Sequence, residues 1–316
     1  MKPLVLAIAG SDRSGTTLVD TILGGFPQVF SAGEVWHLWS RGLVQGRLCG
    51  CGTPVDQCPV WTEVVEQAWP EGIDWHVIDG GESLLRSRRS FDALVPGLKD
   101  RYRVATRALA REVAPLYPAI TSVTGAEVIV DSSKRPTWMH LLASMDEIDL
   151  RVVHMVRDPR AVAHSRKRYK RQVDDKVDRG MTQHPPLSTA VFWDIWNLAI
   201  DGFSRTGVPV LRVRYEDLIA APTKETERIA RFAGLADPVH PTLTDESVEL
   251  APSHTVSGNP ARFDTGRVPL RLDDSWKRAQ STLDRLMVTG VTAPVAMRYG
   301  YPIGVDAPYH GEKEHD

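Results

Sequence analysis

The amino-acid sequence predicts a single α/β domain with a central parallel sheet flanked by helices. Two observations lead to this prediction. Continuous apolar runs rich in β-branched residues recur along the chain, and each is followed by a segment whose apolar residues have helical spacing. Strands that lack an apolar–polar alternation are buried on both faces, which is typical of a parallel sheet covered by helices. The 316 residues are enough for one large domain of this kind.

Four strand–helix units are predicted in chain order. The predicted pairs of strand and following helix are 4–10 with 16–26, 128–133 with 137–147, 150–158 with 161–173, and 210–218 with 223–234. A last helix is predicted from about Ser281 to Tyr299. We therefore expect one domain over residues 1–316, of the P-loop nucleotide-binding type.

Three stretches interrupt this alternation. A mostly helical insertion is predicted at about 35–120, and it contains a cysteine-rich loop. The segment 174–188 is polar and contains prolines, so we expect a loop that could act as a lid. The segment 254–276 is irregular in pattern.

Composition excludes several classes of function. The net charge of −2 gives no overall positive field, so we expect no nucleic-acid partner. No stretch approaches the roughly 20 apolar residues of a membrane span, and the apolar segment 3–9 is too short for a signal peptide. We expect a cytoplasmic protein, and the sequence leaves its oligomeric state open.

The segment GSDRSGTT, residues 10–17, follows the first predicted strand. Gly10 and Gly15 have the spacing of a nucleoside-triphosphate loop, but Thr16 occupies the position of its lysine. Backbone N–H groups at the start of the next helix would still bind a phosphate. Arg13 adds a positive charge, and Thr16 and Thr17 add hydroxyls. The alternative is a glycine turn that only packs the strand on the helix.

A second basic element ends the third predicted strand. Seven Lys or Arg and one Asp lie between Arg157 and Arg171. Arg157 could bind a phosphate with two hydrogen bonds, and Ser165 could donate a hydroxyl from the following helix. The alternative is an Arg157–Asp158 surface ion pair followed by a solvated helix. Two anion sites on one sheet predict a ligand that carries phosphates at two places.

These motifs resemble a known family. RSGTT after a strand, VRDPRAVAHS at 156–165 and YEDL at 215–218 are similar to the sulfotransferases that use 3′-phosphoadenosine 5′-phosphosulfate, PAPS. The segments CGCGTPVDQCPVW, HTVSGNPARF and APVAMRYGY resemble bacterial, especially actinobacterial, members. The resemblance implies transfer of a sulfuryl group from PAPS to a hydroxyl acceptor, leaving 3′-phosphoadenosine 5′-phosphate, PAP. A P-loop kinase and a non-catalytic PAP- or PAPS-binding protein remain alternatives.

The resemblance also implies roles for the two anion sites. Arg157 and Ser165 would bind the 3′-phosphate of the nucleotide. The residues of the first loop that would bind the 5′-phosphosulfate are Arg13, Ser14, Gly15, Thr16 and Thr17. Because the transferred group is not a γ-phosphoryl, the lysine of the triphosphate loop and its metal are not needed, and we expect no metal in the reaction.

Glu34, in SAGEVWHLW, is the predicted catalytic base, by resemblance to the protein-tyrosine sulfotransferases. The alternative is a glutamate that caps the helix expected at 35–40. His37 is the rival base, because it lies about one helical turn further on. Lys134, in VDSSKRP, resembles the family lysine that contacts the bridging oxygen of the donor, and Arg13 would assist it. A solvated loop lysine is the alternative, and Arg135 could be confused with Lys134.

One late segment resembles the family's loop that closes over the nucleotide. The residues assigned to it are Ser257, Gly258, Asn259 and Arg262, with Lys277 after Trp276. Backbone amides of a glycine turn together with Arg262 would suit a 3′-phosphate. Tyr215 resembles a nucleotide-contacting tyrosine, but as a strand residue it could equally be a packing residue.

Two residue types need a separate interpretation. Cys49, Cys51 and Cys58 form a glycine-rich loop, in which we expect reduced or partly paired thiols. A zinc ion with His37 or another group as fourth ligand is the less favoured alternative, because C-x-C is not the usual spacing.

The nine tryptophans could stack on an aromatic or sugar acceptor, but we expect at least half of them to fill the core. The resemblance implies a small-molecule or carbohydrate hydroxyl as the acceptor, and the sequence does not identify it.

Overall fold

The computed structural model describes residues 2–85, 106–168, 182–236 and 238–304, and its centre is a five-stranded sheet in the order β2-β3-β1-β4-β5. All four neighbouring pairs are parallel. The strands are β1 (Leu4–Gly10), β2 (Val29–Gly33), β3 (Val128–Lys134), β4 (Asp149–Val156) and β5 (Val210–Arg214). The predicted parallel sheet is therefore confirmed.

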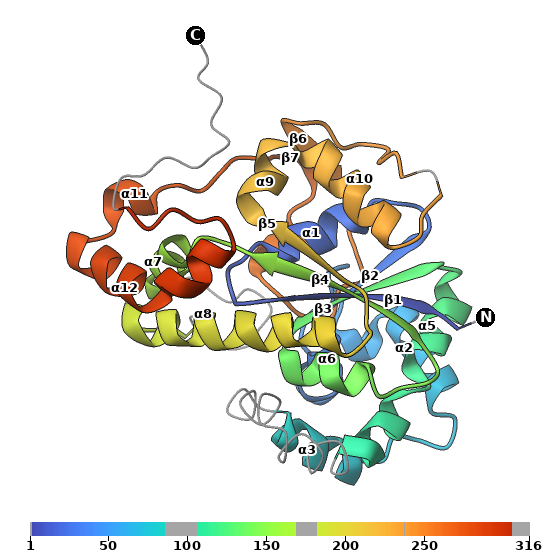
Figure 1. Ribbon diagram of the computed structural model, residues 1–316. Coiled ribbons are helices and arrows are strands. Elements are labelled where there is room, and N and C mark those ends of the chain that lie inside the picture. Colours follow the sequence, from blue (N-terminus) through green and yellow to red (C-terminus); the bar gives the residue numbers. More distant parts are fainter. Residues whose placement is uncertain (1, 86–105, 169–181, 237, 305–316) are drawn as a thin grey trace.

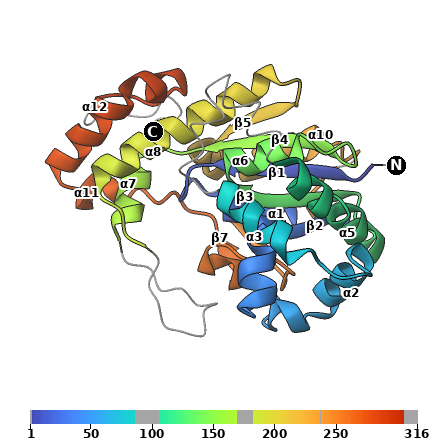
Figure 2. The same cartoon turned by 90° about the horizontal axis from the view of Figure 1, so that it is seen from below.

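Helices cover both faces of this sheet (Figures 1 and 2). One face carries α1 (Thr16–Leu23), α9 (Tyr215–Ala220) and α10 (Pro222–Phe232). The other face carries α5 (Leu116–Thr124), α6 (Pro136–Leu142) and α8 (Pro186–Asp201). The central strand β1 is apolar on both sides, as its position requires: Leu6 and Ile8 pack toward α1, whereas Val5, Ala7 and Ala9 pack into the larger cluster on the opposite face.

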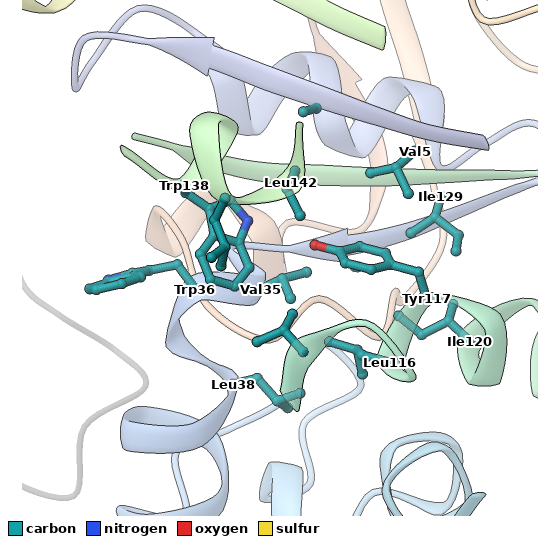
Figure 3. Packing of buried hydrophobic residues seen from close by; sticks show 14 of the residues in the cluster. Val5, Val35, Trp36, Leu38, Leu116, Tyr117, Ile120, Ile129, Trp138 and Leu142 are labelled. Atoms are coloured by element: carbon teal, nitrogen blue, oxygen red, sulfur yellow. The ribbon is translucent and has the colours of Figure 1, made fainter. Parts of the chain in front are cut away.

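The larger cluster extends from the sheet into the helical insertion (Figure 3). The insertion contains η1 (Val35–His37), the π-helix η2 (Leu38–Val44), η3 (Val55–Gln57), α2 (Pro59–Ala68) and α3 (Trp75–Leu84). Trp36, Trp39 and Trp138 meet edge to face, with ring centroids 5.9 and 6.2 Å apart. Because the insertion shares a core with the sheet, it belongs to the same domain.

At the other end of the sheet lie α7 (Pro159–Lys167), α11 (Trp276–Ala279) and α12 (Thr282–Arg298). Two short strands, β6 (Ser247–Leu250) and β7 (Gly266–Pro269), form a small antiparallel pair. Two further short helices are η5 (Gly202–Arg205) and η6 (Pro260–Phe263). Helices α7, α8 and α12 pack on one another. The predicted last helix is confirmed as α12, which is one residue shorter at each end than the predicted range.

Several predicted bounds were wrong. β2 and the β6–β7 pair were not predicted, because they are short and contain small or polar residues instead of continuous apolar runs. The strand expected at 210–218 ends at Arg214, and Tyr215 begins a helix. Most of the expected lid, at 174–181, lies outside the described residues, and the expected loop is wrong at 186–188, where α8 begins.

Candidate active site

The five parallel strands all end at the same edge of the sheet, and residues with functional side chains follow directly. Gly10 opens the first loop, Glu34 follows β2, and Lys134 is the last residue of β3. Arg157 follows β4 and Tyr215 follows β5. In open parallel sheets, ligands bind beyond this carboxyl edge. The geometry therefore brings these predicted site residues together.

Glu34 and Lys134 form a close charged pair at this edge. Lys134 Nζ lies 2.6 Å from Glu34 Oε1, and the Glu34 residue is only 9% exposed. His37 Nε2 lies 3.7 Å from the other carboxylate oxygen of Glu34. Burial, with a smaller contribution from the Arg41 guanidinium, holds the pKa of His37 well below its usual value. His37 is therefore neutral at physiological pH, and the cation in direct contact with Glu34 is Lys134.

Backbone contacts position this acid–cation pair. The N–H of Trp36 donates to the Ser133 hydroxyl at 2.9 Å, which ties the chain after Glu34 to the end of β3. Ser133 in turn donates to the buried carboxylate of Asp131. Asp131 also accepts from Tyr117 Oη and Trp138 Nε1, both at 2.7 Å. Figure 3 shows the Tyr117 hydroxyl directed toward Trp138. The sequence analysis missed this buried network, although VDSSK contains Asp131 and Ser133.

Arg13 and Lys134 share an unusual backbone conformation. Among the described residues other than glycine, these two have positive φ, 68° and 66°. A positive φ costs conformational energy in residues other than glycine, and such residues cluster at functional sites that need a particular backbone geometry. The two predicted catalytic cations are therefore held in strained turns at adjacent strand ends, β1 and β3.

The first loop leads into α1 through a left-handed glycine. Gly15 has φ 86°, and a Cβ built on it would lie 2.5 Å from Cδ2 of Tyr215. Helix α1 begins at Thr16 without a side-chain cap and without an acidic residue in its first turn. Ser14 is buried, and its hydroxyl is 2.8 Å from that of Ser11. The amides at this helix start lie where the sequence predicts an anion site, and the site itself stays a prediction.

Arg157 lies directly against the first loop. It donates from one guanidinium nitrogen to the Arg13 carbonyl at 3.1 Å and from another to the Asp273 carbonyl at 2.9 Å. Its guanidinium carbon is 4.4 Å from the ring centre of Tyr215. Ser165 is 5% exposed on α7. The two predicted anion sites are thus contiguous at this edge.

The alternative interpretation of Arg157 is wrong. Asp158 is buried and pairs with Arg160 at 2.7 Å instead of forming a surface pair with Arg157. Asp158 also accepts from the backbone N–H of Arg160 and so caps α7. Arg160 is 3% exposed, so the described part of α7 is not merely a solvated basic helix.

The late-loop residues have different environments. A Cβ built on Gly258 would lie 3.7 Å from Glu34 Oε1 and 3.8 Å from Thr17 Oγ1, so Gly258 reaches both the predicted base and the first loop. Arg262, by contrast, is 3% exposed and donates to the carbonyls of Thr255 and Leu48, each at 2.7 Å. In this arrangement Arg262 holds the loop, and its expected role as a phosphate ligand stays a prediction.

The remaining late-loop residues are accounted for as follows. The Asn259 side chain accepts from the N–H of Ala261 at the start of η6. The Ser257 hydroxyl accepts from Arg41 at 3.3 Å. Lys277 lies on α11, which packs on α7, and is 3.9 Å from Asp274. Ser257 and Asn259 therefore serve the loop's own geometry, and Lys277 is placed on the Ser165 side.

The tryptophans mostly fill the core, as expected. Seven of the nine are buried, namely Trp36, Trp39, Trp61, Trp69, Trp138, Trp193 and Trp276. Trp193 donates to the Arg157 carbonyl at 3.0 Å, and Trp196 donates to the Lys134 carbonyl at 3.3 Å. Trp193 is 1% exposed, so its suggested stacking on an acceptor is wrong. Helix α8 instead supports the ends of β3 and β4, a role that spacing within the sequence does not reveal.

Asp20 is another buried carboxyl group that the sequence analysis missed. It lies on the inner face of α1 and accepts hydrogen bonds from Ser31 at 2.5 Å and Ser132 at 2.6 Å. Burial raises the pKa of Asp20 to about 7, against the lowering effect of these two hydrogen bonds. Asp20 therefore links α1 to β2 and β3 beneath the site.

The three thiols come together with a histidine, but not with His37. Cys49, Cys51 and Cys58 have their sulfur atoms near Nδ1 of His254, and the ligand atoms of this group all lie within 4.8 Å of one another. All three cysteines are free in the structure.

No helix in the described part of the chain is long and apolar enough to cross a membrane.

Comparisons with known proteins give a consistent picture. Residues 5–260 match the family described as "Sulfotransferase domain". Human "Carbohydrate sulfotransferase 3" is 26% identical over 185 residues, which cover 54% of this chain and 37% of that protein. The match thus spans little more than a third of this relative.

Two solved structures share the fold. The "Sulfotransferase Domain from the Synechococcus PCC 7002 Olefin Synthase" has 22% identity and a TM-score of 0.52, covering 97% of each chain. The "Sulfotransferase Domain from the Curacin Biosynthetic Pathway" has 15% identity and a TM-score of 0.51, covering 96% of this chain and 99% of the other.

Proposed function

The chain belongs to the sulfotransferase domain family, and we propose that it transfers a sulfuryl group from PAPS to a hydroxyl acceptor. The observation that carries this proposal is the contact between the two anion sites. Arg157, at the end of β4, donates to the carbonyl of Arg13 in the loop after β1, at 3.1 Å. A single nucleotide with phosphates at two places could therefore contact both sites.

The donor set suits PAPS. The first turn of α1 offers backbone N–H groups without a capping side chain, and Gly258 carries no side chain where it approaches Glu34 and Thr17. Arg13, Ser14, Thr16 and Thr17 would surround the 5′-phosphosulfate. Arg157 and Ser165 would take the 3′-phosphate. The loop has no lysine at position 16, the group that reaches the β- and γ-phosphates in a triphosphate loop.

The proposed chemistry is an in-line displacement at sulfur. The acceptor oxygen forms a bond to sulfur while the bond from sulfur to the bridging oxygen of the donor breaks. Glu34 accepts the proton of the hydroxyl, and Lys134 donates a hydrogen bond to the bridging oxygen as negative charge develops there. The 2.6 Å contact supports this assignment, because it places the proposed base and the proposed cation side by side at the carboxyl edge of the sheet. His37, neutral and beside the other carboxylate oxygen, would orient Glu34.

The acceptor is proposed to be a small-molecule or carbohydrate hydroxyl. Sugar hydroxyls are the first to test, because the human relative carries the name of a carbohydrate sulfotransferase. A screen with isotopically labelled PAPS, read by mass spectrometry, would detect the sulfated product. Phenolic and lipid alcohols form the comparison set.

Donor identity is tested separately by thermal unfolding. PAP should raise the melting temperature of the protein in a concentration-dependent way, because a ligand that binds only the folded state stabilises it. Adenosine 5′-phosphate, which lacks the 3′-phosphate, should give a smaller shift, and Arg157→Lys should reduce the difference between the two. A larger stabilisation by Mg-ATP than by PAP would refute the proposal.

A further inference from the structure

We propose that Cys49, Cys51, Cys58 and His254 form a structural zinc site. Three sulfur atoms and one imidazole nitrogen are a common ligand set of structural zinc, and four protein ligands leave no open position for catalysis. Thiolate ligands also favour zinc over magnesium or calcium. The site lies outside the residues proposed for transfer, and its existence does not depend on the proposed function.

Three of the ligand–ligand distances are close to those around a tetrahedral ion, and all of them lie within 4.8 Å. Bonds of about 2.3 Å to sulfur and about 2.0–2.1 Å to nitrogen produce S···S edges of about 3.8 Å and S···N edges of about 3.6 Å. Cys51 and Cys58 have their sulfur atoms 3.7 Å apart. His254 Nδ1 is 3.3 Å from the sulfur of Cys58 and 3.9 Å from that of Cys49. A disulfide would require about 2.05 Å between two sulfur atoms.

The local fold turns these four groups toward one point. The N–H of Cys49 donates to Thr53 at 2.7 Å, and the N–H of Gly52 donates back to Cys49 at 2.9 Å, so the chain makes a tight turn between the first two thiols. Gly52 has φ 89°, which favours glycine. Cys58 immediately precedes α2, and the side chains of Cys49 and Cys58 are fully buried.

His254 is brought to the thiols from a distant part of the sequence. It lies 196 residues after Cys58, and its carbonyl accepts from Trp61 Nε1 at 2.6 Å. The N–H of Gly50 donates to the Thr255 carbonyl at 2.9 Å. A Cβ built on Gly50 would lie 2.6 Å from Thr255 Oγ1, so only glycine allows this approach. These contacts position the histidine without a metal bond, and they leave Nδ1 facing the sulfur atoms.

A metal here would fasten the cysteine loop to the segment that borders Glu34. Beyond His254, the N–H of Val256 donates to Ala32 in β2 at 2.9 Å, and the Ser257 carbonyl accepts from the N–H of Glu34 at 3.4 Å. Gly258 follows, against Glu34 and the first loop. Loss of the ion should therefore loosen the backbone on one side of Glu34. This last consequence rests on the proposed function, whereas the ion itself does not.

The direct test is the metal content of the full chain. The protein is expressed with added zinc, purified in a reducing buffer, desalted and measured by elemental mass spectrometry. We expect about one zinc per chain. Cys58→Ser and His254→Ala should lose most of it, whereas the exposed His76→Ala should retain it. Less than about a tenth of an ion per wild-type chain, or full retention in both ligand variants, would overturn the proposal.

Two measurements on the wild-type protein cover the case in which the variants do not fold. Cobalt(II) replacing zinc should give the visible bands of a tetrahedral ion and a thiolate-to-cobalt charge-transfer band. The three thiols should react slowly with a thiol reagent until a chelator removes the metal, and that removal should lower the melting temperature. An octahedral cobalt spectrum, thiols that react equally fast with and without chelator, or a disulfide found by peptide mass spectrometry in freshly purified protein would contradict the site.

Discussion

The two halves of the sheet's carboxyl edge hold their charged groups in different ways. At β2 and β3, Glu34 and Lys134 contact each other as side chains at 2.6 Å. At β1 and β4, Arg157 donates to the backbone carbonyls of Arg13 and Asp273, and its guanidinium also lies 3.4 Å from the Asp273 carboxylate. A pair of side chains can exchange partners when a substrate arrives, whereas two additional hydrogen bonds to backbone carbonyls restrict the movement of the Arg157 guanidinium. The difference suggests that the first half performs proton transfer and the second half fixes the donor.

Glu34→Gln tests the first half and should have the largest effect. The glutamine amide has nearly the same shape as the carboxylate but cannot take the proton from the substrate hydroxyl, so kcat should fall by about 10²-fold or more. The dissociation constant of PAP, measured by calorimetry, should change little. The exposed Glu63→Gln is the matched control. A kcat within a few-fold of wild type would remove Glu34 from the mechanism.

Arg157→Ala tests the second half. Loss of hydrogen bonds from a charged donor should weaken PAP binding by roughly 10- to 100-fold, while kcat at saturating donor should change less. The exposed Arg205→Ala provides the control. Because Arg157 is buried, its variant must first be shown to melt cooperatively, and Arg157→Lys supplies a second substitution that retains the charge. A fall in kcat without weaker binding would reverse the division between the halves.

Gly15→Ala tests the rigid support of the second half. The new methyl group would overlap Tyr215, and the positive φ of 86° adds backbone strain, so the free energy of unfolding should fall by about 1–3 kcal/mol. Gly125→Ala is a sharp comparison, because Gly125 has φ 69° but nothing within 4 Å of the added carbon. The difference between the two variants in chemical denaturation isolates the overlap with Tyr215. Equal destabilisation would mean that Tyr215 moves aside freely.

Asp20→Asn tests the buried carboxyl group beneath the first half, through the pH dependence of the free energy of unfolding. The pKa of Asp20 is about 7 in the folded protein and is ordinary, near 3.8, after unfolding. Between these values the folded state binds more protons, so Asp20 makes the protein less stable as pH rises from about 4 to 7 and adds no further loss above that. The wild-type free energy of unfolding, relative to the variant, should fall by roughly 1 kcal/mol per pH unit in this window. A difference that is flat with pH would contradict the raised pKa.

Sequence reasoning located most of the site because of one property of parallel sheets. When strands run in the same direction, residues after each strand meet at one edge, so Arg13, Lys134 and Arg157 could be grouped from strand ends alone. Glu34 was assigned by resemblance, and the strand that positions it, β2, was not predicted. The strand has small residues at its end, where Gly33 packs against Thr255 and Val256, so its apolar pattern is too short to recognise.

The sequence by itself determined four strand–helix units and the last helix, and with them the edge of the sheet at which the candidate site lies, because hydrophobic periodicity is a local property. Only the tertiary structure decided which distant groups meet. It buried Arg262 against Thr255 and Leu48, placed Trp193 behind Arg157, and brought His254 to three cysteines near the other end of the chain. These contacts join segments far apart in sequence, and no local spacing records which of them will pack together.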